Sequence, residues 1–98
     1  MHVISRKKIR EFLAAHPSAD PISLDRWYKT AKKARWNHFA DVRSDFPSAD
    51  LVGDLVVFNV GGNKYRLIAE IKYRYQEVYL RHVLTHAEYD KGRWKKGE

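Results

Sequence analysis

Residues 55–85 read LVVFNVGGNKYRLIAEIKYRYQEVYLRHVLT, and this stretch decides the fold because apolar and polar residues alternate along most of it. A period of two is typical of strands with one buried face. Gly61-Gly62 predicts a hairpin turn, since both positions tolerate positive φ, and Tyr75-Gln76 is a weaker second turn. Three antiparallel strands are therefore expected: Leu55–Val60, Asn63–Tyr73 and Val78–Thr85.

Two-residue turns would fix which residues lie opposite one another. The expected pairs are Asn59 with Lys64, Val57 with Arg66, Arg66 with Thr85, and Glu70 with Arg81. One face then collects the apolar side chains Val56, Phe58, Val60, Tyr65, Leu67, Ala69, Ile71, Val78, Leu80 and Leu84. The other face gathers Asn59, Lys64, Arg66, Glu70, Lys72 and Arg81. The first face requires burial, whereas the second is basic.

Two amphipathic helices upstream of the strands can cover the apolar face. Ser5 is expected to cap the first helix, and His16-Pro17 ends it because a residue before proline disfavours helical backbone. Ser23 is expected to cap the second helix, whose apolar side carries Leu24, Trp27, Tyr28, Ala31 and Ala34. The remaining segments are a short edge strand at Met1–Ile4, an ambiguous helical turn at Trp36–Phe46, and a short helix or irregular tail at His86–Trp94. The predicted class is α+β, with two N-terminal helices packed on one face of an antiparallel sheet.

Composition narrows the possible functions. The 98 residues leave room for one domain, 1–98, and the absence of cysteine excludes disulfides and thiolate metal sites. No histidine spacing matches a metal motif, so neither a metal nor a cofactor is expected. Because no apolar run is long enough for a membrane span or a secretion signal, we expect a cytoplasmic protein without a membrane partner.

The net charge of +7 is concentrated in three clusters, around residues 6–10, 29–35 and 91–96. Such a field attracts a polyanion of any sequence through counterion release. An acidic protein partner would use the same charge, and a merely solvated surface would also carry it. Nucleic acid is favoured among these three interpretations.

One arginine and one histidine of this basic region come together in the predicted register. His86 follows Thr85 directly and therefore emerges within about one residue of Arg66. A guanidinium beside an imidazole suits phosphodiester chemistry, although a solvated sheet face is normally polar too. His82 falls on the parity of the buried face, which indicates a structural or rim position.

Three stretches are similar to one known family: WNHFADVRSDFPSAD (36–50), VVFNVGGNKYRLIAEI (56–71) and VYLRHVLTHAEYDK (78–91). Together they resemble the HigB toxins, which belong to the RelE-like messenger-RNA interferases. The resemblance implies a RelE-like fold and an endoribonuclease that cuts mRNA, generally on the ribosome and without a metal ion. It also implies neutralisation by a HigA-type antitoxin with a helix-turn-helix domain, so that DNA is contacted only indirectly.

The resemblance also implies roles for individual residues. Arg66, in the motif YRL, would contact the scissile phosphate, and His86, in THAEYD, would be catalytic. Asn59 stands where RelE has a basic residue, so Lys64 or Arg81 would have to supply a second positive charge.

The C-terminal residues leave several roles open. Tyr89 would donate a proton, stack on a base, or pack at the sheet end. Asp90 would orient His86 or cap the last segment, with the cap preferred, and Trp94 is a candidate for base stacking. Lys91, Lys95 and Lys96 would bind RNA phosphates. The alternatives to a nuclease are a non-enzymatic RNA-binding module and a decayed toxin that acts only as an interaction protein.

Overall fold

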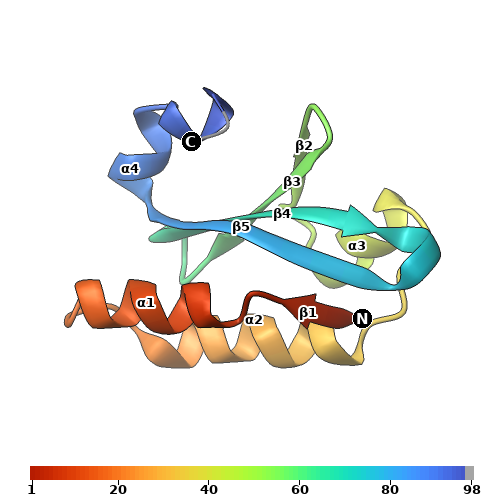
Figure 1. Ribbon diagram of the computed structural model, residues 1–98, viewed down its shortest axis with the longest axis horizontal. Helices are drawn as coiled ribbons and strands as arrows, with labels where there is room; N and C mark the ends of the chain where they lie inside the picture. Colours follow the sequence, from red (N-terminus) through yellow and green to blue (C-terminus); the bar gives the residue numbers. More distant parts are fainter. Residues whose placement is uncertain (97–98) are drawn as a thin grey trace.

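The computed structural model describes residues 1–96, which form a five-stranded sheet with the strand order β1-β5-β4-β3-β2 (Figure 1). The strands are β1 (His2–Ile4), β2 (Asp50–Val52), β3 (Leu55–Val60), β4 (Tyr65–Lys72) and β5 (Glu77–Thr85). Neighbouring strands are antiparallel except β1 and β5, which run parallel. The α+β class is confirmed, and so are the three long strands and the short N-terminal edge strand.

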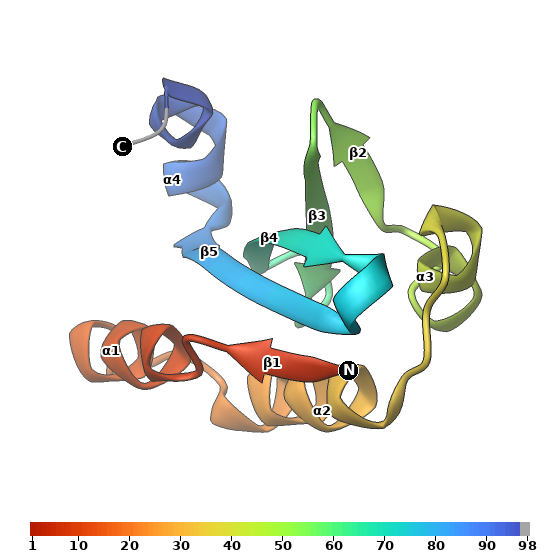
Figure 2. The same cartoon turned by 45° about the vertical axis from the view of Figure 1, so that its right-hand side comes forward.

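The helices are α1 (Lys7–Ala15), α2 (Pro21–Lys33), α3 (Phe39–Asp45) and α4 (His86–Asp90), with short 3-10 turns η1 (Tyr73–Tyr75) and η2 (Arg93–Lys96). Helices α1 and α2 cover one face of the sheet, as predicted, whereas α4 and the β2–β3 hairpin rise from the opposite side (Figure 2). Within residues 1–96 no helix is both long and apolar enough to cross a membrane.

Both predicted helix caps are wrong. Ser5 precedes α1 with a φ of +72°, and α1 begins without a side-chain cap. Asp20 caps α2 by accepting a hydrogen bond from the Ile22 N–H, and the Ser23 hydroxyl donates to the same carboxylate. Asp is as good a cap as Ser, and the proline that follows it fits the first helical position.

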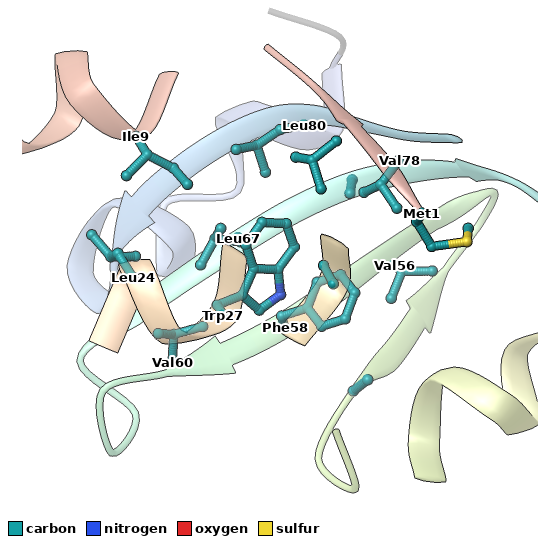
Figure 3. Packing of buried hydrophobic residues seen from close by; sticks show 14 of the residues in the cluster. Met1, Ile9, Leu24, Trp27, Val56, Phe58, Val60, Leu67, Val78 and Leu80 are labelled. Carbon is teal, nitrogen blue, oxygen red and sulfur yellow. The ribbon is translucent and has the colours of Figure 1, made fainter. Parts of the chain in front are cut away.

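The main core lies between the helices and the sheet (Figure 3). Phe58 of β3 is fully buried, with ring centroids 5.3 Å from Trp27 of α2 and 5.1 Å from Phe46. Trp36 stacks on the same ring at 6.2 Å. Removing these rings from water contributes about 25 cal/mol per Å² of apolar area, so this cluster fixes the position of β3 and its neighbour β4.

The first hairpin has a four-residue loop, residues 61–64, instead of the two-residue turn that the sequence predicted. Val60 pairs with Tyr65, and Asn59 lies opposite Arg66. The predicted partner of Asn59, Lys64, is in the loop. A shift of two residues keeps every side chain on its predicted face, because strand side chains alternate with a period of two.

The second hairpin differs in register. Arg66 pairs with Leu84 and Glu70 with Tyr79, so the two predicted pairs across this hairpin are wrong. A bulge next to Ile68 leaves Arg81 as an extra residue, because Ile68 pairs with His82 and the following residue pairs with Leu80. The extra residue reverses the alternation along the rest of β5. Leu84 therefore joins a second, smaller cluster on the open face instead of the main core.

The structure adds one strand that the sequence analysis did not predict. Asp50–Val52 forms β2, joined to β3 by a two-residue turn at Gly53-Asp54. Gly53 has a φ of +61°, which the turn requires. This hairpin forms one wall of the open face.

Candidate active site

Arg66 extends from β4 on the open face of the sheet, opposite the helical layer. The residue is only 8% exposed. Its Nη1 donates to the carbonyl oxygens of Asn63 (3.0 Å) and Tyr65 (3.2 Å), and its guanidinium carbon lies 5.4 Å from the ring centroid of Tyr89. Because these contacts engage one nitrogen and one face of the guanidinium, the group is held in place before any ligand binds.

His86 is the first residue of α4, and it lies beside the residue at which β4 begins, Tyr65. Its main-chain N–H donates to the Lys64 carbonyl oxygen at 3.0 Å. The Thr85 hydroxyl accepts from the Glu88 N–H, and the Glu88 carboxylate accepts from the Thr85 N–H, which is a capping box. This reciprocal cap fixes where α4 begins and therefore where the imidazole leaves the sheet.

The imidazole of His86 has a carboxylate partner on the same helix. Nδ1 of His86 lies 3.0 Å from Oδ2 of Asp90, and both side chains are more than half exposed. The preference for Asp90 as a cap is therefore wrong, since Lys91 ends α4 and Asp90 contacts the histidine. A carboxylate on one ring nitrogen leaves the other nitrogen available to a ligand.

Tyr89 and Trp94 pack against each other. Their rings stack at 5.1 Å, and the Trp94 indole N–H donates to the Tyr89 carbonyl oxygen at 3.1 Å. Trp94 is 4% exposed and belongs to a small cluster with Val57 and Ile68. The interpretation of Trp94 as a free platform for base stacking is therefore wrong, because sheet and tyrosine already cover it. The contacts of the Tyr89 ring with Trp94 and Arg66 also leave its hydroxyl as the group most available for chemistry.

The predicted RNA-binding residues lie at different distances from this group. Asn59 is the direct cross-strand neighbour of Arg66, and Lys64 is exposed in the loop just before β4. Lys91 and Lys95 are exposed after α4, with the Lys95 Nζ 5.6 Å from the Trp94 ring. Lys96 lies in η2, and its side chain is outside the described residues.

Arg81 does not join Arg66. It forms an ion pair with Glu70, and the Lys72 Nζ lies 3.1 Å from the other oxygen of the same carboxylate. The hydrogen bonds from Arg81 and Lys72 lower the pKa of the Glu70 carboxyl below its ordinary value. The positive charge of Arg81 is thus partly neutralised further along the open face.

His82 belongs to the open face, whereas its place in the sequence predicted the parity of the buried face. The bulge at Arg81 places His82 opposite Ile68, on the same side of the sheet as Arg66. Bulges leave only a weak trace in sequence, so the simple parity of residues 78–85 gave the wrong face. Among residues 1–96, no three His, Asp or Glu side chains are grouped so that they could hold a metal ion.

The chain is similar in sequence to one protein family and to several named proteins. The sequence profile of the HigB_toxin family, described as the RelE-like toxic component of a toxin-antitoxin system, matches residues 9–92. The mRNA interferase HigB of Escherichia coli O6:H1 is 32% identical over 94 residues, which cover 93% of this chain and 90% of that protein. The mRNA interferase toxin HigB of Escherichia coli K12 and the mRNA interferase HigB of Shigella flexneri are each 33% identical over 95 residues, covering 92% of this chain and 88% of the relative.

Proposed function

The chain belongs to the HigB family of RelE-like toxins, the toxic components of toxin-antitoxin systems, and on this basis we propose that it is an mRNA interferase. In this proposal it cleaves mRNA bound to the ribosome in the cytoplasm, without a metal ion. The 2′-hydroxyl attacks the adjacent phosphorus, a P–O bond forms, and the bond to the leaving 5′-oxygen breaks. The reaction needs a group to take the first proton, a group to supply the second, and cations for the charge that develops on phosphorus.

The observation that carries the proposal is the grouping of Arg66, His86 and Tyr89 where β4 meets α4. The guanidinium lies 5.4 Å from the tyrosine ring, and the N–H of His86 is bonded to the loop residue Lys64, two residues before Arg66. Two parts of the sequence thus contribute to this group, with Arg66 on β4 and both His86 and Tyr89 on α4. The His86 side chain is 53% exposed, so an RNA phosphate could reach it.

Each residue has a role that follows from its chemistry. Arg66 stabilises charge on the phosphate, and its planar fork matches two phosphate oxygens. His86 transfers a proton, since imidazole is the side chain most often used for general acid–base catalysis and such a group typically contributes about 10²–10⁴-fold. Asp90 holds the imidazole in one orientation. The Tyr89 hydroxyl hydrogen-bonds the phosphate or the leaving oxygen.

The other predicted site residues bind RNA and take no part in the cleavage step. The message or ribosomal RNA would contact Asn59 and Arg81 on the sheet, Lys64 in the hairpin loop, and Lys91, Lys95 and Lys96 after α4. Such phosphate contacts position an RNA and carry little sequence information. A HigA-type antitoxin with a helix-turn-helix domain would neutralise the toxin, and DNA would be contacted only through that antitoxin.

Expression in a bacterium tests the proposal. The wild type should arrest growth and fragment messages, whereas His86→Gln should do neither. The matched control, His2→Gln in the exposed residue of β1, should remain toxic. Intact messages under the wild type would contradict the proposal, and a toxic His86→Gln variant would favour a non-enzymatic RNA-binding module.

A further inference from the structure

A hollow of about 600 Å³ lies on the open face beside the candidate active site. The β2–β3 hairpin contributes Val52 and Leu55 to its lining, and the tail contributes Trp94. Figures 1 and 2 show this hairpin and α4 rising on the same side of the sheet. Apolar walls that stand on a polar sheet suit a flat heterocycle with a hydrogen-bonding edge.

Trp94 connects this hollow to the candidate active site. Trp94 lines the hollow and stacks on Tyr89. Tyr89 in turn contacts Arg66. His82 lines the hollow four residues before His86, which is about 13 Å along an extended strand at about 3.3 Å per residue. This backbone separation places the two histidines at different points along the open face, so each could contact a different nucleotide of one RNA strand.

The polar lining of the hollow is concentrated around His82. Lys8 of α1, Arg81 and His82 line this hollow and also a smaller one of about 290 Å³ along β5, so the two hollows adjoin. Lys8 is half-buried, and no ion pair engages it among the described residues. Two carboxylates line this hollow, Glu70 and Asp54, and Glu70 is already bonded to Arg81 and Lys72. Lys8 is therefore the cation best placed to take a phosphate.

The ring of His82 can hydrogen-bond to the edge of a nucleobase. Burial, followed by the charges of Lys8 and Arg81, lowers the pKa of the His82 imidazole from its ordinary value of 6.5. The ring is thus neutral at pH 7, with one donor and one acceptor nitrogen. Among residues 1–96 no hydrogen bond engages either nitrogen, although the side chain is only partly exposed.

We propose that this hollow is a nucleotide subsite that holds the RNA residue next to the cleaved bond. The base packs against Val52 and Leu55 of the β2–β3 hairpin and hydrogen-bonds to His82, and Lys8 binds the phosphate of the same residue. This inference rests on the proposed nuclease function and makes His82 a specificity-determining residue rather than a catalytic one. Such a subsite would discriminate among bases. A base that cannot hydrogen-bond to His82 would leave the nitrogens of this half-buried ring without a partner, which lowers its affinity.

Binding of an uncleavable RNA tests the subsite directly. The probe is a short 2′-O-methyl RNA oligonucleotide, whose blocked 2′-oxygen cannot attack phosphorus. In proton NMR spectra of the wild-type protein, its addition should shift the imidazole signal of His82 but not those of His2 or His38. If the RNA binds but the imidazole signal of His82 does not shift, the subsite proposal is overturned. It is also overturned if the RNA does not bind at all.

Cleavage by variants supplies the second arm. Both His82→Ala and Lys8→Gln should raise KM about 3- to 10-fold with a smaller effect on kcat. His82→Ala should also flatten the base preference at one position beside the cut. The matched control is Lys7→Gln, in the exposed neighbour of Lys8 on α1, which should behave as the wild type. An unchanged base preference in His82→Ala would overturn the subsite.

The two arms separate the subsite from the proposed function. A wild type that cleaves RNA while its His82 signal stays unmoved would remove the subsite and leave the nuclease. A wild type that shifts His82 on binding RNA but cleaves nothing would remove the nuclease and leave the subsite.

Discussion

Arg66 and Tyr89 form a cation–π pair across the junction of β4 and α4, with 5.4 Å between the guanidinium carbon and the ring centroid. The Arg66 Nη1 is bonded to two main-chain carbonyl groups on its other side, and Trp94 supports the tyrosine. The arginine is thus held by the sheet, the hairpin loop and the last helix together. A donor fixed in advance needs little reorganisation when charge develops on a phosphate.

Replacing Arg66 with lysine tests whether the planar guanidinium group contributes to cleavage beyond its positive charge. Lysine keeps one positive charge but cannot hold both carbonyl groups and still offer two parallel donors to a phosphate. We expect Arg66→Lys to lower the cleavage rate about 10²–10³-fold, the range found for losing one preorganised donor. Single-turnover cleavage measures this, with Arg10→Lys on the exposed side of α1 as the control. A rate near that of the wild type would mean that charge alone suffices.

Two substitutions at Tyr89 separate its hydroxyl from its ring. Tyr89→Phe keeps the stacking on Trp94 and the contact with Arg66, whereas Tyr89→Ala removes both. A hydrogen bond to a charged group is worth about 1.5–3 kcal/mol, so Tyr89→Phe should slow cleavage about 10- to 100-fold while the urea midpoint stays unchanged. Tyr89→Ala should lower the urea midpoint as well. Full activity in Tyr89→Phe would restrict the residue to packing.

The ion pairs of Glu70 predict a pH dependence of stability. Its pKa is lowered from the ordinary value of 4.5 by Arg81 and Lys72, so the ionised carboxylate stabilises the folded state. This stabilisation is complete above the unfolded pKa and is lost as the pH falls through the lower folded value. Urea unfolding should therefore show Glu70→Gln less stable than the wild type near pH 7, with the difference shrinking below about pH 4.5. A difference that stays constant down to pH ~3 would contradict this, and Glu11→Gln serves as the exposed control.

Much of this architecture was predictable from hydrophobic periodicity. The three long strands and the faces of Asn59 and Arg66 follow from alternation, which a shift of two residues leaves intact, and the two covering helices follow from helical spacing of apolar residues. The face of His82 did not follow, because one bulged residue reverses the alternation and its cause lies in the pairing of β4 with β5.

The sequence also contains signals for where helices begin, but the cap of α2 was assigned to the wrong residue. Thr85 and Glu88 carry the spacing of a capping box, which predicts where α4 begins. Asp20 before a proline was a stronger cap signal than Ser23, two residues after that proline. The contact of His86 with Asp90 required the helix to form first, since only a helix brings residues four apart onto one side.

The hairpin loop that presents Arg66 depends on two glycines in different ways. Gly61 and Gly62 both have positive φ, but a Cβ on Gly61 would lie 2.9 Å from the Tyr65 ring, whereas one on Gly62 meets open space. That ring has little freedom, because its hydroxyl accepts from the Asp20 N–H at 2.8 Å and its edge packs on Phe12. Gly62→Ala should cost about 1–2 kcal/mol for the left-handed backbone alone. Gly61→Ala should cost about 1–3 kcal/mol more for the clash. Urea unfolding of the two variants measures the difference, and equal losses would show that the ring moves aside.

The lysines of the C-terminal segment predict a salt dependence of RNA binding. Lys95 is exposed beside Trp94, close to the candidate active site, and Lys96 follows it. Each contact with a phosphate of single-stranded RNA contributes about 0.7 to the slope of log K against log salt. The double substitution Lys95→Ala with Lys96→Ala should therefore weaken binding of a short 2′-O-methyl RNA more at low salt than at high salt and reduce the slope by up to about 1.4. Lys32→Ala with Lys33→Ala, at the end of α2 in the helical layer, should leave the slope for this short RNA unchanged. An unaltered slope in the Lys95 and Lys96 variant would exclude a phosphate-binding role for the tail, because the loss of a contacting cation must change the number of counterions released.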